Sequence, residues 1–194
     1  MSTESIPKIT PGRECGSCTL CCKVLSIDEL KKPQGVWCKH AITGKGCNIY
    51  GTHPSECSKF YCGYLSWPNA GPHWYPRRCK MVIVSELEGS RIAIHVDAGT
   101  PNAWRGEPFY TDIKDWATMG WEQNKQVVVC VLNRAIVILP DRDVDLGPIQ
   151  DDERIISGIV KSSSGQVSNE AYKMKASDPR LAGMVAGKPW VSGK

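Results

Sequence analysis

The fold of this chain is decided by residues 14–22, which read ECGSCTLCC. This stretch carries four cysteines, and four more follow within the next forty residues; the eight are Cys15, Cys18, Cys21, Cys22, Cys38, Cys47, Cys57 and Cys62. Thiols at this density are either cross-linked as disulfides or held by a metal, and the two options belong to different cellular compartments.

The N-terminal sequence argues for a reducing compartment. It reads MSTESIPKITPGRE, with neither a basic start and apolar run nor a small-residue cleavage site, so it lacks the pattern of a secretory signal. We therefore expect a cytoplasmic protein, in which disulfides do not persist. A chain of 194 residues is long enough to fold around an apolar core without them. Metal ligation by the thiols is the favoured interpretation.

Composition and charge exclude few other classes. Hydrophobic residues make up 41% and charged residues 23%, as in ordinary globular proteins, and no apolar run is long enough for a membrane span. The net charge is +4. Residues 161–194 hold six Lys or Arg against two acidic residues, so this stretch accounts for the whole excess.

We predict an α+β fold, with a cysteine-rich, metal-knit module carrying short helices, followed by a small antiparallel sheet with one packed helix. The predicted boundaries are a flexible N-terminus at 1–13, the cysteine module at 14–66, a small α+β segment at 67–145, and a mostly flexible basic tail at 146–194.

Two short helices are predicted in the module. Ser26 and Glu29 form a capping-box pattern that ends at Pro33. Pro54 suits a first helical turn, so a second helix is expected over residues 54–65, with Cys57 and Cys62 about 140° apart around it.

The later segment has strand patterns. The runs at 80–87 and 91–98 predict one hairpin, and residues 126–140 predict another that turns at Asn133 and Arg134. Between them, apolar residues from Phe109 recur at helical spacing.

Cysteine spacing limits what the module binds. Cys15, Cys18 and Cys21 have the CxxCxxC spacing with which bacterial-type ferredoxins present three thiols to an iron-sulfur cluster. Zinc instead takes four thiols, often two from each of two segments, and Cys15 and Cys18 with Cys57 and Cys62 supply such a set. The spacing gives iron-sulfur a slight preference over zinc, and the adjacency of Cys21 and Cys22 leaves a two-centre site open.

Four further residues are candidate ligands or reactive groups. His40 and His53 fall within the cysteine spread and are nitrogen candidates, although eight sulfurs leave little need for them. Cys79 and Cys130 lie in strand-like sequence outside any ligand spacing, and we expect structural roles for both.

The cysteine pattern resembles a known family. CxxCxxCC, then DELKKPQGVWCKH and GCNIYGTHPSECSKFYCGYL, is similar to the YkgJ-type cysteine-cluster family of zinc- or iron-chelating domains over Cys15–Leu65. The resemblance implies that all eight cysteines serve chelation. His53 and Ser58 stand where that family commonly has arginines. Flagellin lysine methylases carry the same pattern in longer chains, but residues 66–194 show no methyl-donor site.

Outside the cluster, His95 and Asp97 sit at period two before a loop bearing Arg105, a pattern that a small catalytic pocket would use. The leading hypothesis is a metal-binding protein with a redox or accessory role and a protein redox partner. The alternatives are a metal-dependent enzyme near His95 and Asp97, or a zinc-stabilised interaction module for a protein or nucleic acid. Nucleic acid is disfavoured because the basic tail offers only Tyr172 and Trp190 for stacking.

Overall fold

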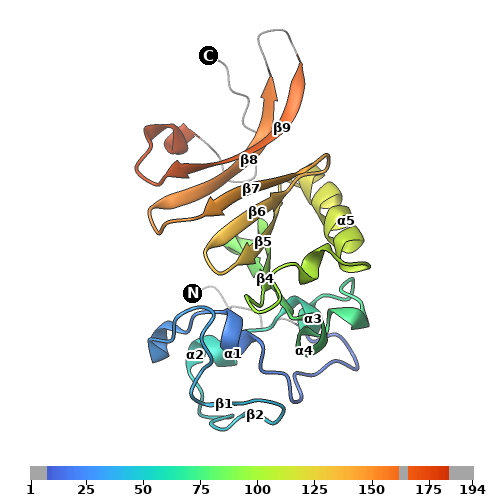
Figure 1. Ribbon diagram of the computed structural model, residues 1–194, viewed down its shortest axis with the longest axis vertical. Coiled ribbons are helices and arrows are strands. Elements are labelled where there is room, and N and C mark those ends of the chain that lie inside the picture. Colours follow the sequence, from blue (N-terminus) through green and yellow to red (C-terminus); the bar gives the residue numbers. More distant parts are fainter. Residues whose placement is uncertain (1–7, 162–165, 184–194) are drawn as a thin grey trace. The chain divides into compact units, whose positions relative to one another are not determined.

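Short helices and small sheets alternate along the chain in the computed structural model, which describes residues 8–161 and 166–183 (Figure 1). The predicted α+β class is confirmed. The chain divides into two compact units. One comprises residues up to Val84 together with His95–Trp104, and the other comprises Ser85–Ile94 and residues from Arg105 onward.

The first unit is built from one-turn helices and a very short hairpin. Its elements before the strands of the main sheet are α1 (Cys21–Val24), η1 (Asp28–Leu30), β1 (Ala41–Ile42), β2 (Gly46–Cys47), α2 (Ser55–Ser58), α3 (Gly63–Ser66), η2 (Pro72–Trp74) and α4 (Pro76–Cys79). Elements this short are marginal alone, so the module depends on tertiary contacts.

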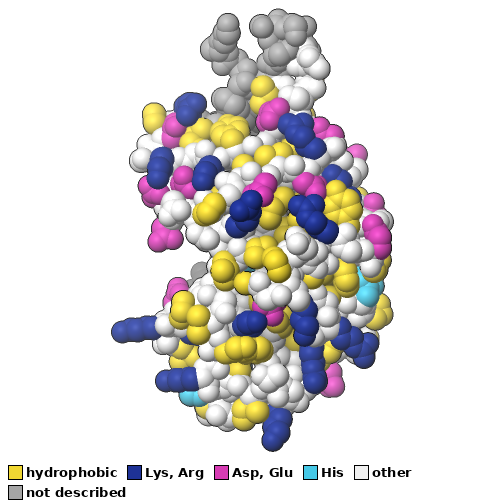
Figure 2. Space-filling model, in the orientation of Figure 1, with side chains coloured by type: hydrophobic (Ala, Val, Ile, Leu, Met, Phe, Trp, Pro, Cys, Tyr) yellow, Lys and Arg dark blue, Asp and Glu magenta, His cyan; other side chains and the backbone are white. Residues whose placement is uncertain are grey.

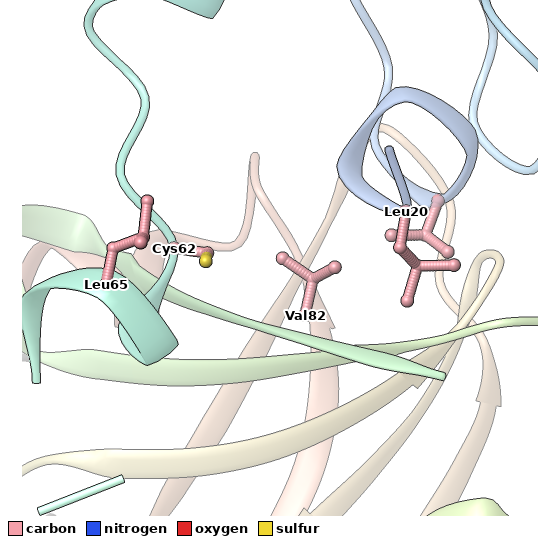
Figure 3. Packing of buried hydrophobic residues seen from close by; sticks show 5 residues of the cluster. Leu20, Cys62, Leu65 and Val82 are labelled. Atoms are coloured by element: carbon pink, nitrogen blue, oxygen red, sulfur yellow. The ribbon is translucent and has the colours of Figure 1, made fainter. Parts of the chain in front are cut away.

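A small apolar cluster holds the first unit together. Its buried members are Leu20, Val24, Cys62, Leu65 and Val82, and Figure 3 shows the Cys62 sulfur close to Leu65 and Val82. Complete burial of a Leu or Val side chain contributes about 1.5–3 kcal/mol. A cluster of only five such residues stabilises the unit modestly.

A five-stranded sheet has the order β3-β4-β5-β6-β7. Its strands are β3 (Met81–Glu86), β4 (Arg91–Val96), β5 (Gln126–Val131), β6 (Arg134–Ile138) and β7 (Asp143–Pro148). The turn η3 (Leu87–Gly89) joins β3 to β4, and η4 (Ala103–Arg105) follows β4. Both predicted hairpins are therefore present.

One long helix, α5 (Phe109–Glu122), packs against β5 and β6. Its buried residues are Ile113, Trp116, Ala117 and Gly120, which share one face at helical spacing. The predicted helix in this region is confirmed. Across the sheet, Val128, Ala135, Val137 and Leu139 are buried together with Ala171.

The C-terminal region differs from its prediction. β8 (Glu153–Lys161) and β9 (Val167–Lys175) form an antiparallel hairpin, followed by η5 (Pro179–Gly183). The expected mostly flexible tail from residue 146 is therefore wrong for the described part, and the rest of that prediction, at 162–165 and 184–194, lies outside the described residues. The hairpin is ordered because Ala171 and Met174 are buried.

Ion pairs also hold this hairpin region. Lys173 lies 3.5 Å from Glu153, Lys175 lies 2.8 Å from Asp152, and Arg180 lies 2.7 Å from Asp178. Figure 2 shows basic and acidic side chains interspersed over the face in view. Each of these three basic residues therefore has an acidic partner beside it on the surface.

Two predicted boundaries also change. Residues 1–7 lie outside the described residues, but 8–13 are anchored, because Arg13 donates 2.7 Å hydrogen bonds to the carbonyls of Tyr64 and Trp67. The cysteine unit extends beyond 66 to Val84 and takes in His95–Trp104.

The two helices predicted in the module are shorter than expected. The first is the 3-10 turn η1, and the Ser26 side chain does not cap it. The second splits into α2 and α3, because Cys62 is extended, with ψ 158°. In the β5-β6 hairpin, Val131 pairs with Arg134, so the turn lies at Leu132 and Asn133 and the positive φ, 51°, falls on Leu132.

Candidate metal centre

A single cavity of about 310 Å³ in the first unit is lined by all eight clustered cysteines. Neither Cys79 nor Cys130 lines it. All ten cysteines of the chain are free thiols. The structure thus gathers the eight predicted ligands and separates the two cysteines for which we expected structural roles.

The Cys15–Cys18 segment is a tight turn. The Cys18 amide donates a 2.9 Å hydrogen bond to the Cys15 carbonyl. Gly16 has φ +52°, a left-handed conformation that glycine adopts without strain. Arg77 donates to the Ser17 hydroxyl at 2.5 Å, and the Tyr75 hydroxyl lies 3.3 Å from the Cys15 carbonyl. These contacts fix the turn at the rim of the cavity.

Cys21 and Cys22 occupy the single turn of α1. Consecutive helical residues point about 100° apart, so the two thiols start in different directions. The Cys38 amide donates to the Cys22 carbonyl at 2.9 Å, which brings the next cysteine of the chain beside α1. Cys47 then enters from β2, where it pairs with Ala41 of β1.

Cys57 is placed by two glutamates that cap each other's helices. The Glu29 carboxylate accepts from the Ser55 hydroxyl at 2.7 Å and from the Glu56 amide at 3.0 Å. In return, the Glu56 carboxylate accepts from the amides of Asp28 and Glu29. The start of α2, and with it Cys57, is thereby fixed to η1. No local pattern in the sequence signals this exchange.

Burial and mutual repulsion make the bare thiols hard to ionise. Burial, followed by the charges of Cys62, Cys18 and Cys22, raises the pKa of Cys15 to about 11. Burial also raises the pKa of Cys18 and of Cys62. A bound cation would reverse this penalty, because metals bind thiolates and release their protons.

The pKa of Cys57, which also lines the cavity, is raised for the same reasons. Burial, and then the charges of Cys22, Cys38 and Cys47, raise its pKa to about 11. The neighbouring Cys21 thiol, through a hydrogen bond, lowers the pKa of Cys22 to about 7 and in turn has its own pKa raised. The thiols of the module therefore differ in how readily they ionise.

Lys32 is a buried cation beside these thiols. Its side-chain nitrogen donates to the carbonyl oxygens of Lys23, at 2.9 Å, and Leu25. The backbone of Lys32 also pairs with Ile27 across η1. Burial lowers the pKa of Lys32, while the charges of Cys22 and Cys38 act to raise it.

The donor chemistry fits thiolate-bound metals, since soft sulfur ligands suit zinc and iron-sulfur clusters. Within residues 8–161 and 166–183, no group of three or more His, Cys, Asp or Glu side chains is arranged as the ligand set of one metal ion. His40 and His53 also line the cavity. His53 stacks on Tyr50 at 5.0 Å and its Nδ1 accepts from the Gly51 amide, so it already has a structural role.

The predicted pocket near β4 has other contacts. Asp97 pairs with Lys23, with the ammonium 2.7 and 2.9 Å from its two oxygens. His95 Nδ1 lies 3.4 Å from the Gln34 amide nitrogen. Arg105 belongs to the second unit and lies 3.8 Å from Asp143. A catalytic role for His95, Asp97 and Arg105 stays a prediction, and Asp97 has a structural partner that its spacing did not reveal.

Comparison of the chain with protein-family models, with curated proteins and with solved structures gives no match. Among the described residues, no helix has the length and apolar character required to cross a membrane.

Proposed function

We propose that this chain is a cytoplasmic metal-binding protein that holds an iron-sulfur cluster or zinc through its eight clustered cysteines. One observation carries the proposal: these eight thiols, and neither of the other two, line one cavity. The CxxCxxCC pattern and its resemblance to the YkgJ-type chelating family support the same conclusion.

Electrostatics supports a metal as the occupant. Cys15 and Cys57 have raised pKa values, first because burial disfavours the charged thiolate and then because neighbouring thiolates repel it. A cation in the cavity converts that repulsion into attraction and draws the sulfurs together. A metal would also supply the stability that the small apolar cluster lacks.

The cysteine spacing gives an iron-sulfur cluster a slight preference over zinc. Cys15, Cys18 and Cys21 have the CxxCxxC spacing that presents three thiols to one cluster, whereas zinc usually takes two thiols from each of two segments. The corresponding role is redox or accessory, with a protein as electron partner.

The test is the metal content of the full chain purified without oxygen or added metal. Plasma mass spectrometry would identify the metal, and absorption spectra before and after dithionite would reveal an iron-sulfur cluster. We expect iron with inorganic sulfide and a visible band that dithionite bleaches. Zinc in a colourless protein would support metal binding and contradict the cluster.

Matched cysteine variants complete the test. Cys79→Ser and Cys130→Ser should retain the full metal content, whereas Cys18→Ser and Cys57→Ser should lose metal. Equal retention in all four variants, or no metal in the wild-type protein after anaerobic reconstitution with either metal, would refute the proposal.

A further inference from the structure

The eight cysteines fall into two groups that begin at α1. Cys21 packs against the apolar cluster of Leu20, Val24, Cys62, Leu65 and Val82. Its neighbour Cys22 lies near the Lys32 ammonium, which feels the charges of Cys22 and Cys38 ahead of that of Cys21. The two thiols are hydrogen-bonded to each other, so the two groups meet at α1.

The first group gathers on the apolar cluster. Cys18 and Cys21 pack against it, and Cys62 is one of its buried members. Cys15 joins them through the tight turn, in which the Cys18 amide donates to the Cys15 carbonyl. Among the cysteine charges felt by Cys15, those of Cys62 and Cys18 come first and that of Cys22 comes third.

The second group gathers around Cys22. The Cys38 amide donates to the Cys22 carbonyl at 2.9 Å, and this contact ties the two segments together. Cys57 feels the charges of Cys22, Cys38 and Cys47, in that order. The glutamate exchange between η1 and α2 holds Cys57 in this position.

We infer that the module holds two metal centres of four thiolates each, one ligated by Cys15, Cys18, Cys21 and Cys62 and the other by Cys22, Cys38, Cys47 and Cys57. Four thiolates complete the ligand set of one zinc ion or one cubane cluster, so eight thiolates supply the ligands of two such centres. The inference rests on the proposed function and adds to it the number of centres and the ligands of each.

The two centres have different surroundings. Four thiolates around a divalent ion leave a net negative charge, which is costly in a partly buried site. Lys32, which is buried and whose strongest thiolate neighbours are Cys22 and Cys38, offsets that charge at the second centre. The first centre sits against aliphatic side chains instead. Adjacent cysteines of α1 place the two centres side by side.

The experiment uses the unmodified full chain and ¹¹³Cd²⁺ as the probe, since cadmium reports thiolate ligation by nuclear magnetic resonance. We expect two bound cadmium ions and two ¹¹³Cd resonances. Scalar couplings should connect one resonance to the β-protons of the first group and the other to those of the second. One resonance, or couplings from one cadmium to both groups, would overturn the inference and leave metal binding intact.

Absence of coupling to any of the eight cysteines would instead refute the proposed function itself. Double variants give a second measurement. Cys15→Ser/Cys62→Ser and Cys38→Ser/Cys47→Ser should each halve the metal bound per chain, whereas Cys79→Ser/Cys130→Ser should leave it unchanged. Complete loss of metal in either within-group variant, in a protein that keeps its circular dichroism spectrum, would contradict two independent centres.

Discussion

Lys23 and Asp97 form an ion pair in which the ammonium nitrogen lies 2.7 and 2.9 Å from the two carboxylate oxygens. Lys23 directly follows Cys22 on α1, and Asp97 directly follows β4. The ammonium also lies 5.7 Å from the centre of the Trp37 ring. The helix that carries two of the eight cysteines is thereby fixed to the end of a strand of the main sheet, within one unit of the chain.

We predict that Lys23→Met lowers the free energy of unfolding by about 1–3 kcal/mol, because it leaves a largely buried carboxylate with fewer donors. Denaturant titration would measure the loss, and Lys31→Met is the control at an exposed lysine. A double variant that also carries Asp97→Asn should recover part of the loss, since no unpaired charge then remains. Equal stability of Lys23→Met and the wild-type protein would show that the pair contributes nothing.

The same pair predicts a dependence on pH. Burial acts to raise the pKa of Asp97, but hydrogen bonds from Lys23 and Gly99, and the charge of Lys23, hold it below its usual value. A lowered pKa in the folded state contributes stability that is complete above the unfolded pKa, about 3.9, and is lost as the pH falls below it. The stability difference between wild type and Asp97→Asn should therefore shrink from pH 7 to pH 3. A difference that grows on acidification would contradict the assignment.

The exchange between Glu29 and Glu56 predicts a loss of metal affinity. Glu29→Ala removes the acceptor for the Ser55 hydroxyl and the Glu56 amide, so α2 is no longer held against η1. Because groups that orient metal ligands typically change affinity by 10-fold or more, we expect roughly 10-fold faster metal loss to a chelator. Glu122→Ala, at an exposed position of α5, is the matched control. Identical release rates in both variants would mean that the caps do not position Cys57.

The second unit was largely predictable from sequence, because burial there follows regular periods. Residues 126–131 and 134–138 are strand-like runs of β-branched residues, and the apolar residues of α5 recur at helical spacing. The C-terminal hairpin was not predicted, because β9 buries only Ala171 and Met174 and so lacks a regular apolar pattern. The hairpin otherwise depends on strand pairing between β8 and β9 and on ion pairs. Composition alone made that stretch resemble a flexible tail.

The cysteine module was predictable in its ligands but not in its geometry. Spacing identified the eight cysteines, and all of them line the cavity. Spacing also placed Cys57 and Cys62 on one helix, whereas the chain breaks between α2 and α3. Tertiary contacts cause that break, since Cys62 and Leu65 are buried in the apolar cluster. Local helix propensity does not encode such contacts, so the sequence pattern did not predict the break.

Substitution of Gly63 is expected to disturb the packing next to Cys62, one of the proposed metal ligands. A Cβ atom at this position would lie 2.7 Å from both Cβ and Cγ2 of Ile83. Gly63→Ala must therefore push α3, with Cys62 at its start, away from β3, at a cost of about 1–3 kcal/mol. Gly99→Ala is the control, because its nearest neighbour is an Asp97 oxygen at an ordinary 3.5 Å. Thermal unfolding of both variants would measure the difference, and equal melting temperatures would show that α3 adjusts freely.

Cys79 and Cys130 are predicted to be unreactive while the protein is folded. Burial raises the pKa of Cys79 to about 12, and that of Cys130 to about 12 as well. The Cys79 thiol also lies 3.5 and 3.4 Å from the carbonyl oxygens of Trp74 and Met81. At pH 8 only about one thiol in 10⁴ would be ionised, so iodoacetamide should label neither residue until denaturant is added. Mass spectrometry of peptides from folded and unfolded protein would measure the labelling.

The raised pKa values of these two thiols also predict how the stability of the protein changes at alkaline pH. A thiol whose pKa is higher in the folded state contributes stability that is present below the unfolded pKa, about 8.5, and is lost as the pH rises toward 12. Cys79→Ala and Cys130→Ala lack an ionisable group at these positions, so each should lose less stability than the wild type between pH 8 and pH 10. Rapid labelling of either thiol in the folded protein would show that it is accessible and would remove the basis for this difference.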